Sequence, residues 1–92
     1  MRALPEKLEL NQNFPNPFNP ATTITYSLPR PADVTLTILN VLGQQVETLV
    51  KEYQGAGTHR RVWNAEGLSS GVYFYSLQAG EFVEARKLLL LR

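Results

Sequence analysis

The chain has 92 residues, a formal net charge of +1 and no cysteine. A chain of this length forms one domain. Such a domain buries roughly 60–65% of its unfolded surface, which is enough for a core that needs no disulfide or metal ion to stabilise it. The small net charge argues against a nucleic-acid interface, which needs a clustered basic face. The lack of cysteine excludes disulfides, zinc–thiolate sites and a cysteine nucleophile, and no apolar run approaches the roughly 20 residues that span a bilayer.

Prolines and glycines divide the chain into two parts. All six prolines lie between Pro5 and Pro31, and all six glycines follow the last proline. Stiff extended backbone is therefore expected in the first third and glycine turns in the rest. We interpret residues 1–6 as a linker remnant and residues 7–92 as the domain, which begins with a short edge strand over 7–12.

An asparagine- and proline-rich stretch, N-F-P-N-P-F-N-P, covers residues 13–20. Its prolines forbid a helix and a central strand, and they push the residues before them into extended backbone. We expect a rigid crossover that Phe14 and Phe18 pin to the body of the domain, with Asx turns at Asn16 and Asn19. The alternative is a proline-rich linker or an SH3-type ligand.

Two regular strands follow the crossover. Residues 21–28 alternate apolar and polar side chains, and residues 33–40 repeat the pattern, which is typical of half-buried strands. The side chains expected to face the core are Ile24, Tyr26, Leu28, Val34, Leu36 and Ile38. In the turn at 41–44, Leu42 is predicted to act as a hydrophobic plug.

The middle of the chain is less regular. Residues 45–51 carry three aliphatic residues at uneven spacing, which predicts a strand with a bulge. Residues 58–64 form the next predicted strand. Its Trp63 is expected to fill the centre of the core.

The last stretch is predicted to be one long hairpin, with strands over 72–77 and 82–91 joined by a glycine turn. The side chains expected to face inward are Tyr73, Tyr75 and Leu77, and those expected to face outward are Val72 and Phe74. Together the segments amount to seven short strands with no helical periodicity. This pattern favours an all-β, seven-stranded immunoglobulin-like β-sandwich over a barrel.

Four consecutive leucines at 88–91 occupy both faces of the final strand. Such a strand is either covered on both sides or exposes an apolar stripe that a partner takes. In the first alternative, Arg86, Lys87 and Arg92 are solvated gatekeepers. The residue pattern leaves both alternatives open.

Residues suited to catalysis are few. The one histidine, His59, is either a general base or a partly exposed strand residue. The carboxylates are scattered, without the paired arrangement across a cleft that sugar hydrolysis needs. We therefore predict that the chain is not an enzyme and binds no metal or other cofactor.

The residue composition leaves two binding functions possible, for a cation and for a sugar. The asparagines of the first third offer side-chain oxygens to a cation, with turn capping as the alternative. Phe74, Phe82 and Tyr53 are candidates for an outward aromatic platform that stacks sugars.

Five segments carry a family resemblance when they are taken together. They are Q-N-F-P-N-P-F-N-P-A-T-T-I (12–24), N-V-L-G-Q-Q-V (40–46), G-T-H-R-R-V-W-N-A (57–65), L-S-S-G-V-Y-F-Y-S-L (68–77) and the closing R-K-L-L-L-L-R. In this order they resemble the type A C-terminal sorting domain of the type IX (Por) secretion system, over nearly the whole chain. Its fold is similar to the immunoglobulin-like domain of the flagellar hook-capping protein.

The resemblance implies a non-catalytic secretion signal that directs a larger exported protein across the outer membrane. The partners it implies are the type IX translocon, a sortase-like peptidase and a covalently linked upstream cargo domain. It implies transit through the periplasm and a final place at the cell surface or outside the cell. Nucleic-acid binding and stable membrane insertion are not expected.

The family motifs fall near the end of the chain. A Gly-x-Tyr motif matches the start of the final hairpin, and a basic-then-hydrophobic motif matches the closing residues. The resemblance therefore implies translocon recognition by Gly71, Tyr73, Arg86, Lys87, Leu88, Leu89, Leu90, Leu91 and Arg92. Arg61 departs from the family, in which a valine-like residue is common between the histidine and the tryptophan.

Two other classes of function remain as alternatives. One is a structural or carbohydrate-binding β-sandwich accessory module of a modular glycoside hydrolase. The other is an oligomerising interaction domain whose exposed terminal strands pair edge to edge.

Overall fold

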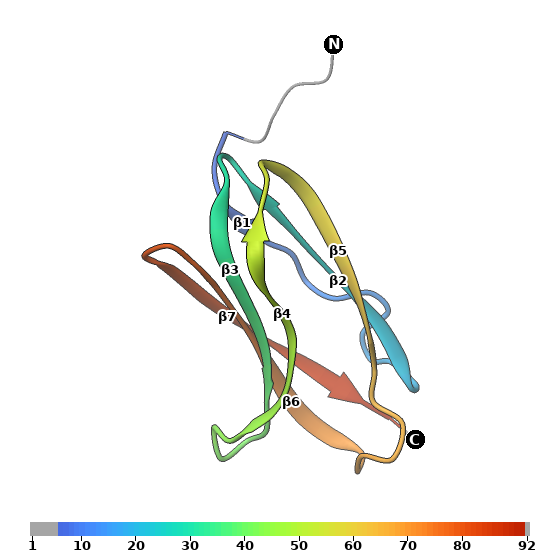
Figure 1. Cartoon of the computed structure of the whole chain (residues 1–92). Coiled ribbons are helices and arrows are strands. Elements are labelled where there is room, and N and C mark those ends of the chain that lie inside the picture. Colours follow the sequence, from blue (N-terminus) through green and yellow to red (C-terminus); the bar gives the residue numbers. More distant parts are fainter. Residues whose placement is uncertain (1–5, 92) are drawn as a thin grey trace.

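The computed structural model describes residues 6–91, and over that range the chain is all-β (Figure 1). The strands are β1 (Glu9–Leu10), β2 (Ala21–Leu28), β3 (Ala32–Leu39), β4 (Gln45–Gln54), β5 (Gly57–Asn64), β6 (Gly71–Ala79) and β7 (Phe82–Leu90). They form two antiparallel sheets, so the prediction of a seven-stranded β-sandwich is confirmed. No helix long and apolar enough to cross a membrane occurs in the described part of the chain.

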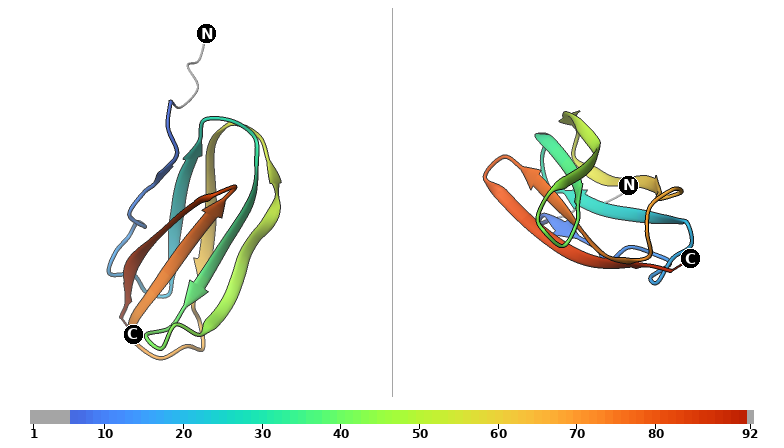
Figure 2. Two further views of the ribbon diagram at one scale, coloured as in Figure 1. Left: turned by 90° about the vertical axis from the view of Figure 1, so that its left-hand side faces the viewer. Right: turned by 90° about the horizontal axis from the view of Figure 1, so that it is seen from below.

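The strand order shows how the two sheets are connected. One sheet has the order β1-β2-β5 and the other the order β4-β3-β6-β7. The neighbours β2–β5 and β3–β6 are not consecutive, so the chain passes repeatedly from one sheet to the other. Figure 2 shows the two layers. The likeness to immunoglobulin domains in particular stays a prediction.

The core lies between the sheets and follows the period-two alternation of side chains along a strand. Every second side chain of β2 is buried, and all six side chains expected inward from β2 and β3 are at most 1% exposed. Trp63 is also 1% exposed, and its ring centroid lies 5.6 Å from that of Phe18 and 5.8 Å from that of Tyr73. The prediction that Trp63 is a core residue is confirmed.

The turn between β3 and β4 differs from the expectation, because Leu42 is 78% exposed and plugs nothing. Asn40 closes this turn instead: its Oδ1 accepts hydrogen bonds from the N–H groups of Leu42 and Gln44 at 2.9 and 3.0 Å. Gly43 adopts φ +77°, a conformation that glycine reaches without strain. The side-chain oxygen fixes the turn, and Leu42 is left at its tip with no element to pack against.

β4 pairs irregularly, as its uneven spacing predicts. Its register with β3 shifts between Leu36 and Thr37 and again between Ile38 and Leu39. Of its aliphatic residues only Val50 is fully buried, at 3% exposure.

The N-terminal part follows the prediction less closely. β1 is two residues long, shorter than the expected 7–12, although its Leu10 is buried at 2% exposure. The predicted linker remnant at 1–6 lies outside the described residues except for Glu6, which is exposed. The domain boundaries therefore stay a prediction.

Candidate functional site

β7 forms the margin of the four-stranded sheet and carries most of the residues that the family resemblance singled out (Figure 1). Leu88 and Leu90 are fully buried between the sheets. Leu89 is half-buried and Leu91 is 50% exposed, and both lie on the outer face. The leucine run thus has one covered face and one open face. This outcome lies between the two alternatives raised by the sequence, which were a strand covered on both faces and a strand with an exposed apolar stripe.

Gly71 and Tyr73 shape the start of β6. Gly71 has φ +147°, which residues with a side chain rarely adopt, and it pairs with Leu90 across the hairpin. Tyr73 pairs with Leu88, and its hydroxyl donates to the carbonyl oxygen of Ser69 at 2.8 Å. Tyr73 is only 9% exposed, so its ring packs in the core while its hydroxyl group fixes the loop that precedes β6.

Arg86 faces inward, whereas its neighbour Lys87 is exposed on the outer face. The Arg86 Nε donates to the carbonyl oxygen of Leu10 at 2.7 Å and so joins β7 to the other sheet. Its guanidinium group also lies 3.6 Å from the Glu84 carboxylate. The Arg86 side chain is 40% exposed, so it is partly solvated, as the gatekeeper interpretation expects, but it is also tied to the backbone of β1. Arg92 lies outside the described residues.

The proline-rich crossover covers part of the free edge of β7. Gln12 Nε2 donates to the carbonyl oxygen of Lys87 at 2.8 Å, and the N–H of Leu89 donates to Asn16 Oδ1 at 3.0 Å. The predicted Asx turn at Asn16 is wrong, since its carboxamide oxygen reaches a different strand. These contacts protect this stretch of edge from pairing with other chains.

The two phenylalanines of the crossover have opposite roles. Phe18 is 2% exposed, its N–H donates to the carbonyl oxygen of Leu89, and its own carbonyl oxygen accepts from the N–H of Leu91, each at 3.0 Å. Phe14 is 79% exposed, so the prediction that it pins the crossover is wrong. Its backbone pairs both ways with Thr23, and because cross-strand partners share a face, the ring points outward as Thr23 does.

Tyr75 and Asn13 form a buried link between β6 and the crossover, which the sequence analysis did not identify. The Tyr75 hydroxyl donates to the carbonyl oxygen of Asn11 at 2.6 Å and accepts from the N–H of Asn13 at 2.9 Å. Asn13 is 2% exposed, and its Nδ2 donates to Thr22 Oγ1 at 3.0 Å. The side-chain oxygens of Asn13 and Asn16 both accept protein hydrogen bonds, from Gln12 Nε2 and from the N–H of Leu89.

Replacing Tyr75 by phenylalanine is expected to lower the free energy of unfolding at neutral pH by about 1–3 kcal/mol, because the N–H of Asn13 and the carbonyl of Asn11 lose their buried partner. Burial, the largest cause, raises the pKa of Tyr75 from its ordinary 10.0 to about 12. Between these values the phenol of the unfolded chain ionises first, so the stability that Tyr75 contributes is present below pH 10 and is lost as the pH rises to 12.

Urea unfolding of the wild type and the Tyr75→Phe variant across this pH range measures the effect. The difference in unfolding free energy between them is expected to shrink as the pH rises. Burial also raises the pKa of Tyr26, but both chains carry that residue and its effect cancels. A difference that stays constant to pH 12 contradicts the assignment.

His59 contacts an aromatic ring and a backbone carbonyl group. Its ring stacks on Tyr26 with a centroid distance of 5.5 Å, and its Nε2 lies 2.8 Å from the carbonyl oxygen of Gly55. Within residues 6–91, no three histidine, aspartate or glutamate side chains gather as a metal site. Arg61, the departure from the family pattern, pairs with Glu52 at 3.6 Å at the rim of the sandwich.

The aromatic residues proposed for sugar stacking do not share one surface. Tyr53 is 68% exposed on β4. Phe74 and Phe82 are half-buried on β6 and β7, and β3 lies between β4 and β6 in the sheet. No continuous platform of these three rings forms.

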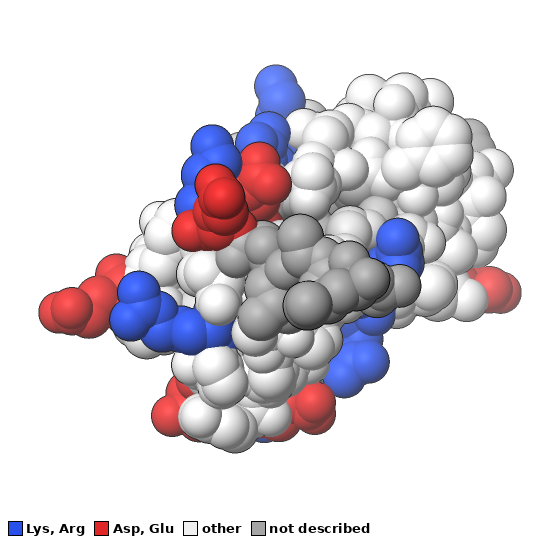
Figure 3. All heavy atoms as spheres, turned by 90° about the horizontal axis from the view of Figure 1, so that it is seen from above, with Lys and Arg blue, Asp and Glu red and all other residues white. Residues whose placement is uncertain are grey.

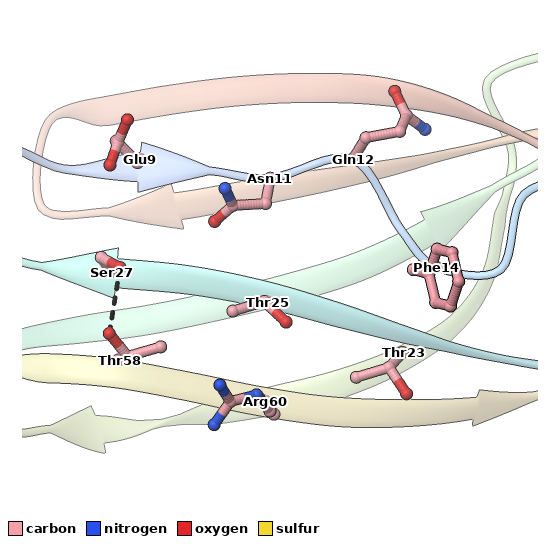
Figure 4. A pocket seen from close by; sticks show the side chains of 9 residues that line it. All are labelled: Glu9, Asn11, Gln12, Phe14, Thr23, Thr25, Ser27, Thr58 and Arg60. Atoms are coloured by element: carbon pink, nitrogen blue, oxygen red, sulfur yellow. Dashed lines mark hydrogen bonds between the residues drawn. The ribbon is translucent and has the colours of Figure 1, made fainter.

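A shallow hollow of about 500 Å³ lies on the outer face of the three-stranded sheet (Figure 4). Ser27 and Thr58 line it with hydroxyl groups, whose oxygens are 3.3 Å apart, and the exposed ring of Phe14 stands at one end. Glu9 is its one carboxylate and Arg60 its one cation. The hollow lacks the second carboxylate that acid–base hydrolysis of a sugar requires.

Charged side chains of both signs are interspersed on the surface. Figure 3 shows lysine and arginine beside aspartate and glutamate on the face seen from above. This distribution fits the small net charge and offers nucleic acid no basic field on this face.

Comparisons with known proteins agree with the β-sandwich fold. A structure of PorZ, described as an essential bacterial surface component of the type-IX secretion system of Porphyromonas gingivalis, aligns with a TM-score of 0.64 and 21% sequence identity. The match covers 88% of this chain but 11% of PorZ, so the chain spans about a tenth of that protein's length. No curated protein matches the chain significantly.

A protein-family model provides the identification. The model for the secretion system C-terminal sorting domain, Por_Secre_tail, matches residues 12–91. The matched range includes the crossover, both sheets and the leucine run of β7. The chain therefore belongs to the family of secretion-system C-terminal sorting domains.

Proposed function

We propose that this chain is the non-catalytic signal that takes a covalently linked upstream cargo protein through the type IX translocon and across the outer membrane. The observation that carries the proposal is the family match over residues 12–91. The shared fold with a domain of PorZ, itself described as a component of the type IX system, supports it. Membership of the family implies export to the cell surface or the extracellular space.

The finer parts of the proposal concern the route and the partners. The cargo passes through the periplasm, the translocon reads the folded sorting domain, and a sortase-like peptidase then removes it. The proposal gives the chain no catalytic step, and its one histidine packs on Tyr26.

We assign the recognition residues two roles according to burial. Lys87, Leu89 and Leu91 present a basic and apolar strip on the outer face of β7, which the translocon contacts. The inward residues keep that strip in a fixed position; they are Gly71, Tyr73, Arg86, Leu88 and Leu90. Arg92 also belongs to the proposed recognition residues, but it lies outside the described residues.

A reporter with an inner-membrane signal peptide and this chain at its carboxyl end tests the proposal in a host with a type IX system. The wild-type fusion is expected outside the cell or on its surface. The double substitution Lys87→Glu and Leu91→Ser is expected to reduce the exported fraction about tenfold, the factor that corresponds to about 1.4 kcal/mol of lost binding free energy. The displaced fusion should accumulate in the periplasm.

A matched control separates recognition from folding. Val83 is 63% exposed on the same face of β7 but far from the leucine run. Val83→Ser should therefore leave export unchanged. Circular dichroism of the isolated chains must show that all variants remain folded; equal export of the double variant and the wild type would overturn the assignment of the strip.

A further inference from the structure

The outer face of the three-stranded sheet carries a regular grid of side chains. Every second residue of β2 points outward, because the residues between them are buried. The register of β2 with β5 on one side, and with β1 and the crossover on the other, sets three outward rows that run across the strands. The rows are Glu9, Ser27 and Thr58; Asn11, Thr25 and Arg60; and Phe14, Thr23 and Val62.

This grid explains why the face is hollowed. β2 is the middle strand, and its outward side chains in the three rows are short: Thr23, Thr25 and Ser27. Longer side chains project from the chain on either side, among them Glu9 and Arg60 (Figure 4). The threonine and serine residues of β2 therefore form the floor of the hollow described above.

The size of the hollow suits a small extended ligand. Its floor runs for about 14 Å along β2, because each residue of a strand advances the chain by about 3.4 Å. Its volume of about 500 Å³ lies within the range of roughly 300–1,000 Å³ that small-molecule sites occupy. The hollow is open along its length, so a ligand longer than the floor can extend beyond it at either end.

One end of the hollow is apolar. Phe14 is 79% exposed and Val62 is 65% exposed, and they flank Thr23 from opposite sides. The backbone of Phe14 is held in place, because its N–H and its carbonyl oxygen both bond Thr23, at 3.0 and 2.9 Å. The fold thus presents an aromatic ring to solvent at a fixed position, where it can stack against the apolar surface of a ligand.

The middle row is polar, and its groups are available to a ligand. Among residues 6–91, no hydrogen bond or ion pair engages the carboxamide of Asn11, the hydroxyl of Thr25 or the guanidinium group of Arg60. These three groups lie side by side and offer both donors and acceptors. A ligand that carries several hydroxyl groups can therefore take the place of solvent on all three.

The charges of the hollow favour a ligand without net charge. Glu9 is its one carboxylate and Arg60 its one cation, so their charges cancel. A phosphate-bearing ligand needs several cations to neutralise it, and here it would meet Glu9 as well. A neutral molecule that combines apolar C–H surfaces with many hydroxyl groups is a carbohydrate.

We infer that this hollow is a binding site for a neutral oligosaccharide. One sugar ring stacks on Phe14, and the hydroxyl groups of the neighbouring sugars bond Asn11, Thr25 and Arg60. The site binds without cleaving, since it has a single carboxylate. The inference is independent of the proposed function, because the strip on β7 belongs to the other sheet.

Titration of the ¹⁵N-labelled chain with cellohexaose, xylohexaose and mannohexaose, each followed by NMR, tests the inference. At least one of these neutral probes is expected to shift the amide signals of β2 and β5 in a saturable way. The hollow is shallow, so the dissociation constant should be on the order of 1 mM. No saturable shift with any of the three probes at about 10 mM, or shifts confined to the other sheet, overturns the inference.

A charged probe tests the predicted neutrality. Hexagalacturonate has a similar length but carries a carboxylate on every sugar, and Glu9 repels it. It is expected to bind more weakly than the best neutral probe. Tighter binding of hexagalacturonate would contradict the choice of an uncharged ligand.

Variants test the two kinds of contact. Phe14→Ala is expected to weaken binding of the best neutral probe about tenfold, as loss of a stacked ring does, and Phe14→Trp should retain it. Thr25→Val removes a hydroxyl group at nearly constant size and should weaken binding about fivefold. Tyr53→Ala is the matched control, since Tyr53 is 68% exposed but lies on β4 in the other sheet. Unchanged affinity in Phe14→Ala, or an equal loss in Tyr53→Ala, contradicts the site.

Discussion

Replacing Trp63 by alanine is expected to lower the free energy of unfolding by about 3–5 kcal/mol. The indole is 1% exposed and contacts the rings of Phe18 from the crossover and Tyr73 from β6. Its Nε1 also donates to Glu47 on β4 at 3.1 Å. One side chain therefore joins the crossover to both sheets, and the variant loses packing in all three places.

Urea unfolding followed by circular dichroism measures this loss. A domain of this size has roughly 5–15 kcal/mol of stability in total, so the variant should unfold at a clearly lower urea concentration than the wild type. Val62→Ala is the matched control, since Val62 precedes Trp63 on β5 and is 65% exposed; its effect should stay within about 0.5 kcal/mol. Similar losses in the two variants would show that Trp63 is not the central contact.

Leu90→Ala is expected to cost about 2–5 kcal/mol, and Leu91→Ala less than about 0.5 kcal/mol. The two leucines are adjacent in sequence, but Leu90 is fully buried and Leu91 is 50% exposed. The side-chain chemistry is the same, so burial alone separates the two results. Thermal unfolding of both variants gives the comparison, and equal costs would contradict the assignment of the faces of β7.

The same contrast guides how the terminal strand is tested. Deleting residues 88–92 removes Leu88 and Leu90 from the core together with the outer strip, so a loss of export would follow from unfolding as readily as from lost recognition. Substitutions on the outer face separate these causes, because they leave the core intact.

Much of the fold was predictable because its strands are amphipathic. Alternation identified β2 over the same residues that the structure assigns, and it identified which side chains of β2, β3 and β6 face the core. The uneven spacing in β4 likewise predicted its irregular pairing. In these strands the side chains that the sequence pattern marks as apolar are the same ones that the sandwich buries. Sequence periodicity was therefore sufficient to predict which side chains face the core.

The errors lie where hydrogen bonds, rather than the alternation of apolar and polar residues, set the direction of a side chain. Phe14 and Leu42 are large and apolar, but pairing with Thr23 turns one outward and the Asn40 turn leaves the other unsupported. Asn13 and Arg86 are polar, yet hydrogen bonds to Tyr75 and to the β1 backbone draw both inward. The partners of Asn13 and Arg86 are more than sixty positions away in sequence, beyond the reach of any local pattern.

The family resemblance identified the residues of the candidate site, but it did not indicate which of them face the core and which face outward from β7. The closing motif groups all the recognition residues together, whereas the register of β7 against β6 places Leu88 and Leu90 inside and Lys87, Leu89 and Leu91 outside. Only the pairing with Gly71 and Tyr73 fixes that choice, since a shift of one residue would exchange the faces.

The location of a reporter fused to this chain is the most direct test of its role as a folded secretion address. In a host with an intact type IX system, the fusion is expected outside the cell or on its surface, and in the same host without the translocon it is expected in the periplasm. The same distribution in both hosts would contradict the proposed function.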